Sequence, residues 1–227
     1  MSSPSQPRSR LGSARNMATA VLLVTLGFST LILLSKLSAF HLPGNFQGYE
    51  PEQPIAFSHR LHAGEMEVPC LYCHSGAAKS RYAGIPSANV CMNCHRFVAA
   101  SLGAVRAEDR LAQEENREAR PVVSEEVEKL YRALGLNSKL EPAGQAAPIA
   151  WVRIHNLPDF AYFDHRAHVG AGVDCQRCHG PVETMERVRQ IEDLSMGFCV
   201  NCHRQVEGTR LADREVHPSI DCATCHY

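Results

Sequence analysis

The sequence has no excess of charge of one sign and few aromatic side chains. Its 227 residues include 23 lysines and arginines and 24 aspartates and glutamates, a net charge of -1 at pH 7. Without a basic surplus, the composition gives no indication of nucleic-acid binding, and we expect none. Aromatic residues form only 7% of the chain, which is little for a hydrophobic core of this size. We therefore expect other apolar groups to complete the core.

No cysteine lies outside one repeated motif. The chain has ten cysteines, and all of them belong to five C-x-x-C-H units. In chain order these are motif 1 (Cys70, Cys73, His74), motif 2 (Cys91, Cys94, His95), motif 3 (Cys175, Cys178, His179), motif 4 (Cys199, Cys202, His203) and motif 5 (Cys222, Cys225, His226). Zinc ribbons and disulfide scaffolds also use paired cysteines, but neither requires a histidine directly after every pair. The motifs favour another use of the thiols.

The spacing within each motif predicts covalent attachment of a c-type haem. Two thiols one helical turn apart can add to the two vinyl groups of a haem, and the adjacent histidine then reaches the iron as proximal ligand. We predict five covalently bound c-type haems, held by the ten cysteines of the motifs. The proximal iron ligands are then His74, His95, His179, His203 and His226. Five buried macrocycles would also supply the apolar surface that aromatic residues do not.

A second repeated pattern supplies candidates for the distal ligands. The pattern F-x-H-x-x-H precedes motif 1 and again precedes motif 3, beginning at Phe57 and at Phe163. Histidines three residues apart lie on one side of a short helix, and their directions diverge enough to serve different haems. We predict that the four histidines of this pattern are distal iron ligands: His59, His62, His165 and His168.

The fifth distal ligand has several candidates. His155 lies in the apolar stretch 151–160 before motif 3, whereas His217 lies in an acid-flanked loop before motif 5. We predict that His155 is the ligand and that His41, close to the apolar N-terminal run, is solvated. The alternatives are His217, Met185 and Met196, of which the methionines more commonly pack around haem. If every iron has two protein ligands, none has an open position for a substrate, which favours electron transfer over catalysis.

The N-terminal run predicts a membrane anchor. Arg8, Arg10 and Arg15 are followed by the uncharged stretch from Asn16 to Ser35, which as a helix spans roughly the 30 Å of a bilayer core. We predict a cytoplasmic basic tail over 1–15, an uncleaved anchor over 16–36 and a haem domain on the periplasmic side of a bacterial inner membrane, because the basic flank stays inside. A cleaved signal peptide is the alternative, although its apolar core is usually only about 7–15 residues.

The rest of the chain contains a duplication. Residues 37–54 are rich in proline, glycine and polar residues and predict a stalk. Residues 55–98 and 151–205 each contain F-x-H-x-x-H and two haem motifs, the second reading C-x-N-C-H-R, which predicts two related two-haem modules. Residues 99–150 form a charged insertion between the modules, and residues 206–227 form a segment for the fifth haem.

The insertion predicts helices rather than strands. Residues 104–120 are strongly charged and predict a solvated helix, to which we assign no chemistry. Ser124 is a candidate N-cap for a second helix with an apolar face from Val127 to Leu134 and with Gly135 as its end. Alternating strand-like patterns are few anywhere in the chain. We expect a mainly α fold with much irregular structure, plus one N-terminal transmembrane helix.

The F-x-H-x-x-H pattern ahead of C-x-x-C-H resembles the class III multihaem cytochromes c. This resemblance implies a class III-like fold built around the five haems. It also implies that the first histidine of each pair serves the haem of the nearby motif and that the second serves a different haem. His59 is then paired with the haem of motif 1, and His165 with the haem of motif 3.

The order of features along the chain is similar to that of the pentahaem cytochrome c component of alternative complex III, a bacterial quinol-oxidising membrane complex. The likeness rests on the anchor, the five motifs, the run WVRIHNLPDFAYFDHRAH from Trp151 to His168 and the run SMGFCVNCHR at motif 4. It covers the chain from the anchor to Tyr227, except that the charged segment 104–120 has no counterpart that we can match.

The resemblance implies an electron-transfer subunit that is not itself an enzyme. In that family the quinol site belongs to a polytopic subunit of a respiratory or photosynthetic complex. The pentahaem subunit relays electrons with a monohaem cytochrome c and an iron-sulfur subunit, toward a soluble carrier or an oxidase. Related complexes that reduce quinone have similar subunits, so both directions of electron flow agree with the sequence.

Two other functions are compatible with the motifs. A multihaem reductase would need one haem without a distal ligand, beside lysine, arginine or tyrosine side chains. A freestanding quinol dehydrogenase would need a quinone pocket, for which a single membrane helix offers few walls. Both therefore rank below the relay.

Overall fold

The computed structural model describes residues 10–37 and 45–226, in two compact units divided at Pro43 and Gly44. His41, most of the predicted basic tail and the first part of the predicted stalk lie outside the described residues.

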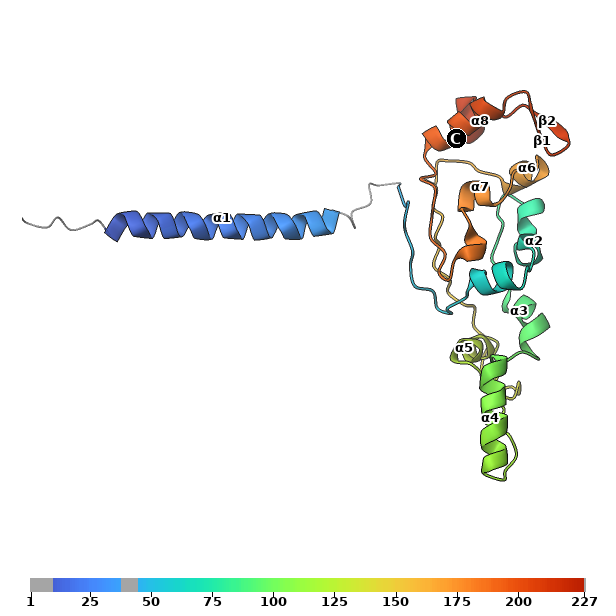
Figure 1. Ribbon diagram of the computed structural model, residues 1–227. Helices are drawn as coiled ribbons and strands as arrows, with labels where there is room; N and C mark the ends of the chain where they lie inside the picture. The colour runs from blue at the N-terminus through green and yellow to red at the C-terminus, as the bar shows by residue number, and fades with distance from the viewer. Residues whose placement is uncertain (1–9, 38–44, 227) are drawn as a thin grey trace, which may run out of the picture. The chain divides into compact units, whose positions relative to one another are not determined.

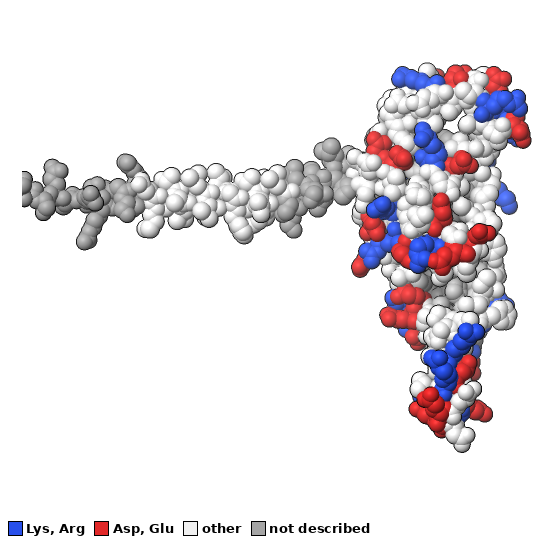
Figure 2. Space-filling model, in the orientation of Figure 1, with Lys and Arg blue, Asp and Glu red and all other residues white. Residues whose placement is uncertain are grey.

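The N-terminal unit is one long helix, α1 (Arg10–Leu37). Its segment Asn16–Leu34 has a mean hydropathy of 2.3 and is long and apolar enough to cross a membrane, as both an anchor and a signal sequence are. The hydroxyls of Thr25 and Thr30 donate to backbone carbonyls one turn earlier, so they leave no hydrogen-bonding group unsatisfied in an apolar surrounding. In Figure 2 this helix shows no acidic or basic side chain along its described surface.

The second unit consists of short helices joined by irregular chain (Figure 1). The first module contains the π-helix η1 (Arg60–Glu65), α2 (Cys70–Cys73), the 3-10 turn η2 (Ser75–Ala78) and α3 (Ala88–His95). The second module contains α6 (His165–Gly170), α7 (Gln176–His179), the 3-10 turn η3 (Val182–Thr184) and α8 (Met196–Val206). The chain ends with β1 (Thr209–Leu211), β2 (Arg214–Val216) and α9 (Cys222–Cys225). The expectation of a mainly helical, irregular fold is confirmed.

The insertion forms the two expected helices, with one boundary moved. Helix α4 (Leu102–Glu114) ends earlier than residue 120 because Asn116 takes a left-handed conformation with φ 49°. Helix α5 (Glu125–Ala133) begins as predicted: the Ser124 hydroxyl accepts a hydrogen bond from the Val127 amide. It stops before Gly135, whose φ of +73° suits glycine. Figure 1 shows α4 extending away from the rest of this unit, and Figure 2 shows acidic and basic side chains crowded on it.

Side chains alone make a very small core. The buried hydrophobic residues of the described chain are Ala77, Met92, Ala112, Leu130, Tyr131 and Met185. Only Met92, Leu130 and Tyr131 join into a cluster, where α5 packs on α3. A unit of this size normally buries far more apolar surface, so the fold agrees with a core that relies on other apolar groups.

The short hairpin β1–β2 was not predicted. Its register pairs Thr209 with Val216 and Leu211 with Arg214, leaving Ala212 and Asp213 as the turn. Neither residue gives the Asn-Gly or Asp-Gly signal that marks such turns in a sequence. The hairpin packs closely on Gly172, where a Cβ atom would lie 2.9 Å from the Ala212 Cβ. A tertiary contact therefore accompanies a hairpin whose local sequence gives little indication of it.

Candidate haem-binding sites

Each C-x-x-C-H motif forms a helical turn, which brings its two thiols to one side. In motifs 1, 3 and 5 the histidine amide donates to the carbonyl of the first cysteine, at 2.9, 3.1 and 2.9 Å. Side-chain caps start the helices of motifs 4 and 5: Ser195 Oγ accepts from the Phe198 amide, and Asp221 Oδ1 accepts from the Ala223 amide. The local sequence thus builds the turn that double thiol attachment needs.

The described residues do not form a zinc ribbon or a disulfide scaffold. None of the ten cysteines forms a disulfide. Within the described ranges, no three histidine, cysteine, aspartate or glutamate side chains gather as metal ligands, whereas a structural zinc site needs four such ligands. Single histidines instead approach one another in pairs.

Four proximal histidines each face one histidine of the F-x-H-x-x-H patterns. An imidazole nitrogen binds a first-row metal at about 2.0–2.1 Å, so two imidazoles on opposite sides of one ion have ring centroids on the order of 6 Å apart. The observed centroid separations and interplanar angles are 6.5 Å and 5° for His59–His74, 6.0 Å and 55° for His62–His95, 6.2 Å and 10° for His165–His179, and 6.1 Å and 35° for His168–His203. All four separations suit one iron between two imidazoles.

Hydrogen bonds orient most of these rings. Six of them have Nδ1 within 2.7–2.9 Å of a backbone carbonyl: His62 (Ser58), His74 (Gly84), His95 (Val98), His165 (Arg81), His168 (Asp164) and His203 (Ser219). A carbonyl can only accept, so Nδ1 carries the hydrogen and Nε2 keeps its lone pair. A metal needs that lone pair, and such outer contacts fix ring direction.

Burial keeps several of the histidines neutral. It lowers the pKa of His59 to about 4, with His74 and His62 adding smaller effects, and it lowers the pKa of His179 to about 3. Burial also lowers the pKa of His168. Neutral imidazole is the form that binds a metal. The Nδ1 atom of His59 is buried without a hydrogen-bond partner, the one such histidine nitrogen among the described residues.

The phenylalanine of each F-x-H-x-x-H pattern supports both of its histidines. Phe57 stacks on His62 with centroids 4.2 Å apart and meets His59 edge-on at 4.9 Å. In the second copy, Phe163 stacks on the second histidine at 4.6 Å and meets the first edge-on at 4.8 Å. The sequence shows that this residue repeats, but its supporting role emerges only from the structure.

His155, predicted as the fifth distal ligand, lies beside a proximal histidine. Its Nε2 is 3.2 Å from Nδ1 of His179, and the two rings meet edge-on with centroids 4.3 Å apart. Burial, followed by the nearby His165, lowers the pKa of His155 to about 4. A neutral His155 can accept the Nδ1 hydrogen of His179, the position that backbone carbonyls occupy at motifs 1, 2 and 4.

The other candidates for the fifth distal ligand are dispersed. His217 lies on an exposed surface, with Nδ1 2.8 Å from Glu207 and Nε2 3.5 Å from Glu215. The hydrogen bond to Glu207 raises its pKa, which favours the protonated form that cannot bind a metal. Met185 is buried next to η1, where its carbonyl accepts from the Arg60 amide, whereas Met196 is 64% exposed at the start of α8.

Motif 5 differs from the other four because an aromatic side chain stands near its histidine. The ring of Phe160 lies 5.8 Å from the ring of His226, at an interplanar angle of 29°. Backbone contacts hold the two segments together: the Tyr162 amide donates to the Cys225 carbonyl at 2.8 Å, and Ala161 and His226 form an isolated antiparallel bridge.

Electrostatic interactions link the thiols of neighbouring motifs. Burial raises the pKa of several motif thiols, and a thiol of a neighbouring motif raises it further. The interacting thiols are Cys73 and Cys94, Cys70 and Cys175, Cys178 and both Cys199 and Cys202, and Cys199 and Cys225. These pairs link motif 2 to motif 1, motif 1 to motif 3, motif 3 to motif 4 and motif 4 to motif 5. A hydrogen bond of 3.0 Å from Asn93 to the Tyr72 hydroxyl further links motifs 2 and 1.

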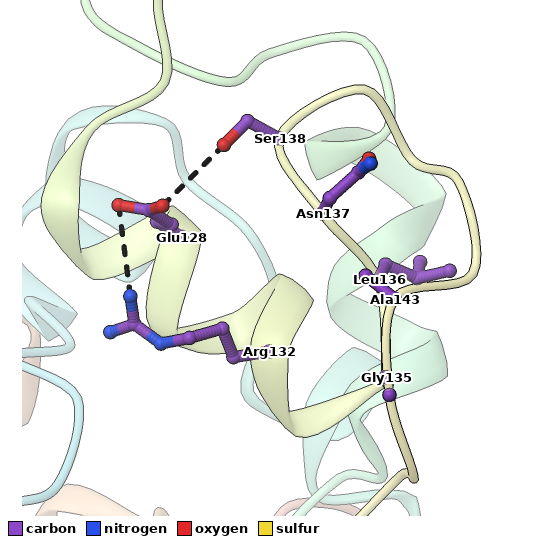
Figure 3. A pocket seen from close by; sticks show the side chains of 8 residues that line it. Glu128, Arg132, Gly135, Leu136, Asn137, Ser138 and Ala143 are labelled. Atoms are coloured by element: carbon purple, nitrogen blue, oxygen red, sulfur yellow. Dashed lines mark hydrogen bonds and ion pairs between the residues drawn. The ribbon is translucent and has the colours of Figure 1, made fainter.

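A shallow hollow beside α5 is separate from the motifs (Figure 3). Glu128 lies 3.7 Å from the guanidinium of Arg132 and accepts a long hydrogen bond from Ser138 at 3.5 Å. None of its 8 lining residues is a cysteine or a histidine. The hollow therefore contributes no haem ligand.

Residues 161–227 match the family described as cytochrome c7 and related cytochrome c. The chain is also 30% identical, over 130 residues, to the protein named menaquinone reductase, multiheme cytochrome c subunit, of Nitratidesulfovibrio vulgaris. That match covers 57% of this chain and 47% of the relative, so the chain spans about half the length of the curated protein that it matches. Residues 161–227 are thus similar to cytochrome c7 and related cytochrome c, and part of the chain is similar to a multihaem cytochrome c subunit.

Proposed function

We propose that this chain is a membrane-anchored pentahaem cytochrome c that relays electrons within a quinone-linked membrane complex, as in alternative complex III. The observation that carries the proposal is the set of four facing histidine pairs, 6.0–6.5 Å apart, each beside a C-x-x-C-H turn. That arrangement suits iron bound on both sides by imidazole and provides little room for a substrate at those positions.

The residues of each motif hold one c-type haem. The two cysteines would form its thioether links, and the motif histidine would supply the proximal nitrogen. His59, His62, His165 and His168 supply distal nitrogens for motifs 1, 2, 3 and 4, the partners that their ring separations indicate. When bound, c-type haem supplies reversible one-electron chemistry at iron. The polypeptide orients the imidazoles, excludes competing ligands at four motifs and keeps the attachment points adjacent.

The row of motifs supports a relay with two ends. Motif 2 lies at one end, where α3 packs on the insertion helix α5, and motif 5 lies at the other, where Ala161 pairs with His226. Each motif has a neighbour whose thiol is close enough to shift a pKa. Electrons therefore enter and leave through different parts of the surface, which suits an intermediate carrier between two partner proteins.

We infer the partners from the anchor and from the relatives. Helix α1 would hold the haem domain at the outer face of a bacterial inner membrane. A relative named as a subunit of menaquinone reductase supports a quinone-linked complex. The proposed partners are an iron-sulfur subunit, polytopic quinol-binding subunits and a monohaem cytochrome c, followed by a carrier or oxidase. The likeness to subunits of both quinol-oxidising and quinone-reducing complexes is compatible with either direction of flow.

We further propose that His155 serves motif 3 as a hydrogen-bond acceptor instead of an iron ligand. Its Nε2 is already 3.2 Å from His179 Nδ1, while the ring centroid of His165 lies 6.2 Å from that of His179. An imidazole acceptor at this position strengthens electron donation from the proximal ligand, a known means of tuning a metal centre.

The test is to purify the full chain from its native membranes in detergent and to measure haem content, spin state and associated subunits together. We expect five haems per chain by pyridine haemochrome assay and intact mass, with at least four low-spin haems. We also expect iron-sulfur and polytopic subunits in the same preparation. A solitary chain with fewer haems, or with mostly high-spin haem, would contradict the relay.

A further inference from the structure

The two modules pack on each other through reciprocal backbone contacts. In the first module the amide of Arg60, directly after the first distal histidine, donates to the Met185 carbonyl at 2.9 Å. In the second module the corresponding amide, of Arg166, donates to the Ser80 carbonyl at 3.2 Å. Met185 and Ser80 each lie six residues after the histidine of a haem motif. The interface between the modules is therefore self-complementary, as an interface about a two-fold axis is.

The residue that follows each accepting carbonyl differs in charge. It is Arg81 where the chain contacts the distal pattern of the second module, and Glu186 where it contacts that of the first. The carbonyl of Arg81 accepts from Nδ1 of His165 at 2.8 Å. The carboxylate of Glu186 accepts from Nε of Arg60 at 2.6 Å. Corresponding positions of the interface thus carry charges of opposite sign.

The charged group beside the first distal histidine of the first module is negative. Arg60, next to His59, forms ion pairs with two carboxylates, those of Glu186 and Glu65. A hydrogen bond from Ser58, followed by one from Arg60, lowers the pKa of Glu186, so this residue is ionised at neutral pH. One cation and two anions therefore leave one negative charge in this group.

The corresponding group of the second module is positive. Arg166, next to His165, forms an ion pair with Asp164 at 2.9 Å. The guanidinium of Arg81 lies over the ring of Tyr162, 4.5 Å from its centroid, and its Nε atom is buried. The aromatic face attracts this cation and shields it from water. Two cations and one anion therefore leave one positive charge in this group.

These two groups lie next to different haem sites. His59 faces His74 of motif 1, whereas His165 faces His179 of motif 3. A nearby cation favours the reduced iron, because the oxidised iron carries one more positive charge. A unit charge about 10 Å from an iron changes the equilibrium constant for reduction roughly tenfold at an effective dielectric constant of about 20.

We propose that this exchange of charge gives the haem of motif 3 a higher reduction potential than the haem of motif 1, so that the central step of the relay is downhill into the second module. The inference rests on the proposed function, because it requires a haem at both motifs. In this step the iron of motif 1 is oxidised from Fe(II) to Fe(III), and the iron of motif 3 accepts the same electron. Arg81 and Glu186 bind no iron and act on the two potentials through their charge.

The test is spectroelectrochemical titration of the full chain in detergent at pH 7. Arg81→Gln should lower one midpoint potential by the equivalent of a tenfold change, about 59 mV for a one-electron couple. Glu186→Gln should raise a different potential, by a smaller amount because its side chain is 59% exposed and solvent screens its charge. All haems should keep their spin state, since the carbonyl that binds His165 belongs to the backbone.

Two further variants separate charge from structure. Arg81→Lys keeps the cation and should retain most of the potential that Arg81→Gln loses. Arg110→Gln is the matched control, because it removes the same charge from an exposed position on α4, which extends away from the rest of its unit (Figure 1). It should shift neither potential.

A marked haem assigns the effect to motif 3. His165→Met should raise the potential of that haem, as a methionine ligand does. Arg81→Gln in this background should lower the marked component, and lowering of another component would overturn the assignment.

The remaining outcomes are equally decisive. Unchanged potentials in Arg81→Gln and Glu186→Gln, or an equal shift in Arg110→Gln, would overturn the proposal while leaving the relay intact. Fewer than five haems in the unaltered chain would instead contradict the proposed function. If Arg81→Gln does not fold, Glu186→Gln, at an exposed position, still tests the proposal.

Discussion

The two modules have almost the same ring geometry but different surroundings. The edge-on phenylalanine contact is 4.9 Å and 83° in the first module and 4.8 Å and 86° in the second. The facing pairs at motifs 1 and 3 are nearly parallel, at 5° and 10°. The backbone differs, because the first pattern begins a π-helix whereas the second begins an α-helix capped by Asp164. The two copies thus keep the same arrangement of phenylalanine and histidine rings although their backbones differ.

The two modules also differ in the groups that lie next to the Nδ1 atoms of their histidines. In motif 1, Nδ1 of His74 lies 2.7 Å from the Gly84 carbonyl oxygen. In motif 3, Nδ1 of His179 lies next to the imidazole of His155 instead. The first distal histidine has a buried, unpartnered Nδ1 in the first module, but in the second module the Arg81 carbonyl accepts at 2.8 Å. The duplication preserves the ligand positions, while the surrounding chain gives each site its own electrostatic environment.

Removing a distal histidine should break both modules alike and has the largest expected effect. We expect His62→Ala and His168→Ala each to convert one low-spin haem per chain to a high-spin form, because an imidazole is lost from a facing pair. Optical and electron paramagnetic resonance spectra measure the conversion. His217→Ala, which removes an exposed histidine, is the control and should change neither spectrum. Unchanged spectra for His62→Ala and His168→Ala would show that the distal assignment is wrong.

Substitution of His155 should affect the second module alone. His155→Leu removes the acceptor behind His179, so the proximal ligand donates less charge and one haem potential rises. Loss of a hydrogen bond worth about 1 kcal/mol corresponds to a rise on the order of 40 mV for a one-electron couple. Spectroelectrochemical titration measures this shift, and His155→Gln, which keeps an acceptor, should restore part of it. A new high-spin haem in His155→Leu would instead support the ligation predicted from sequence.

A hydrogen bond between the insertion and motif 2 distinguishes the first module in a smaller way. The Tyr131 hydroxyl, on a residue only 1% exposed, donates to the His95 carbonyl at 2.5 Å. We expect Tyr131→Phe to lower the free energy of unfolding by about 1–3 kcal/mol, since a part-buried hydrogen bond to the His95 carbonyl is lost. Urea unfolding of the holoprotein measures the change. Tyr82→Phe, at an exposed tyrosine, should have little effect; an equal loss there would argue against the specific contact.

The smallest expected effect is that acid destabilises helix α4 of the insertion without destabilising either two-haem module. Hydrogen bonds from the Arg117 side chain, then from the Arg120 amide, lower the pKa of Glu108 to about 2. A carboxylate with a lowered folded-state pKa stabilises the fold at pH values above its ordinary pKa. That contribution is lost as pH falls from about 4.5 toward 2. Hydrogen exchange of α4 should therefore increase over this window. The increase should be smaller in Arg117→Gln, where the larger of the two contributions is already absent. An identical pH response in the variant would exclude this ion pair as the cause.

The sequence predicted the elements that depend on local spacing. The helix after Ser124, its end at Gly135 and the mainly helical, irregular fold were all confirmed. It did not reveal the end of α4 at Glu114, where a left-handed Asn116 overrides the charged helical pattern. It also missed the hairpin Thr209–Val216, whose turn has no local signal. The haem-site residues remain predictions, although four facing pairs give them a geometric basis.

The sequence by itself determined the attachment motifs, the repeated histidine pairs and the apolar N-terminal helix, because each is encoded within a few turns of contiguous chain. Only the tertiary structure decided which imidazoles lie close to each other. It also placed His155 within hydrogen-bonding distance of His179 and the ring of Phe160 near the ring of His226. It also decided the order of the motifs in the row. These relations join residues far apart in the chain, so they depend on packing and on backbone pairs such as Ala161 with His226.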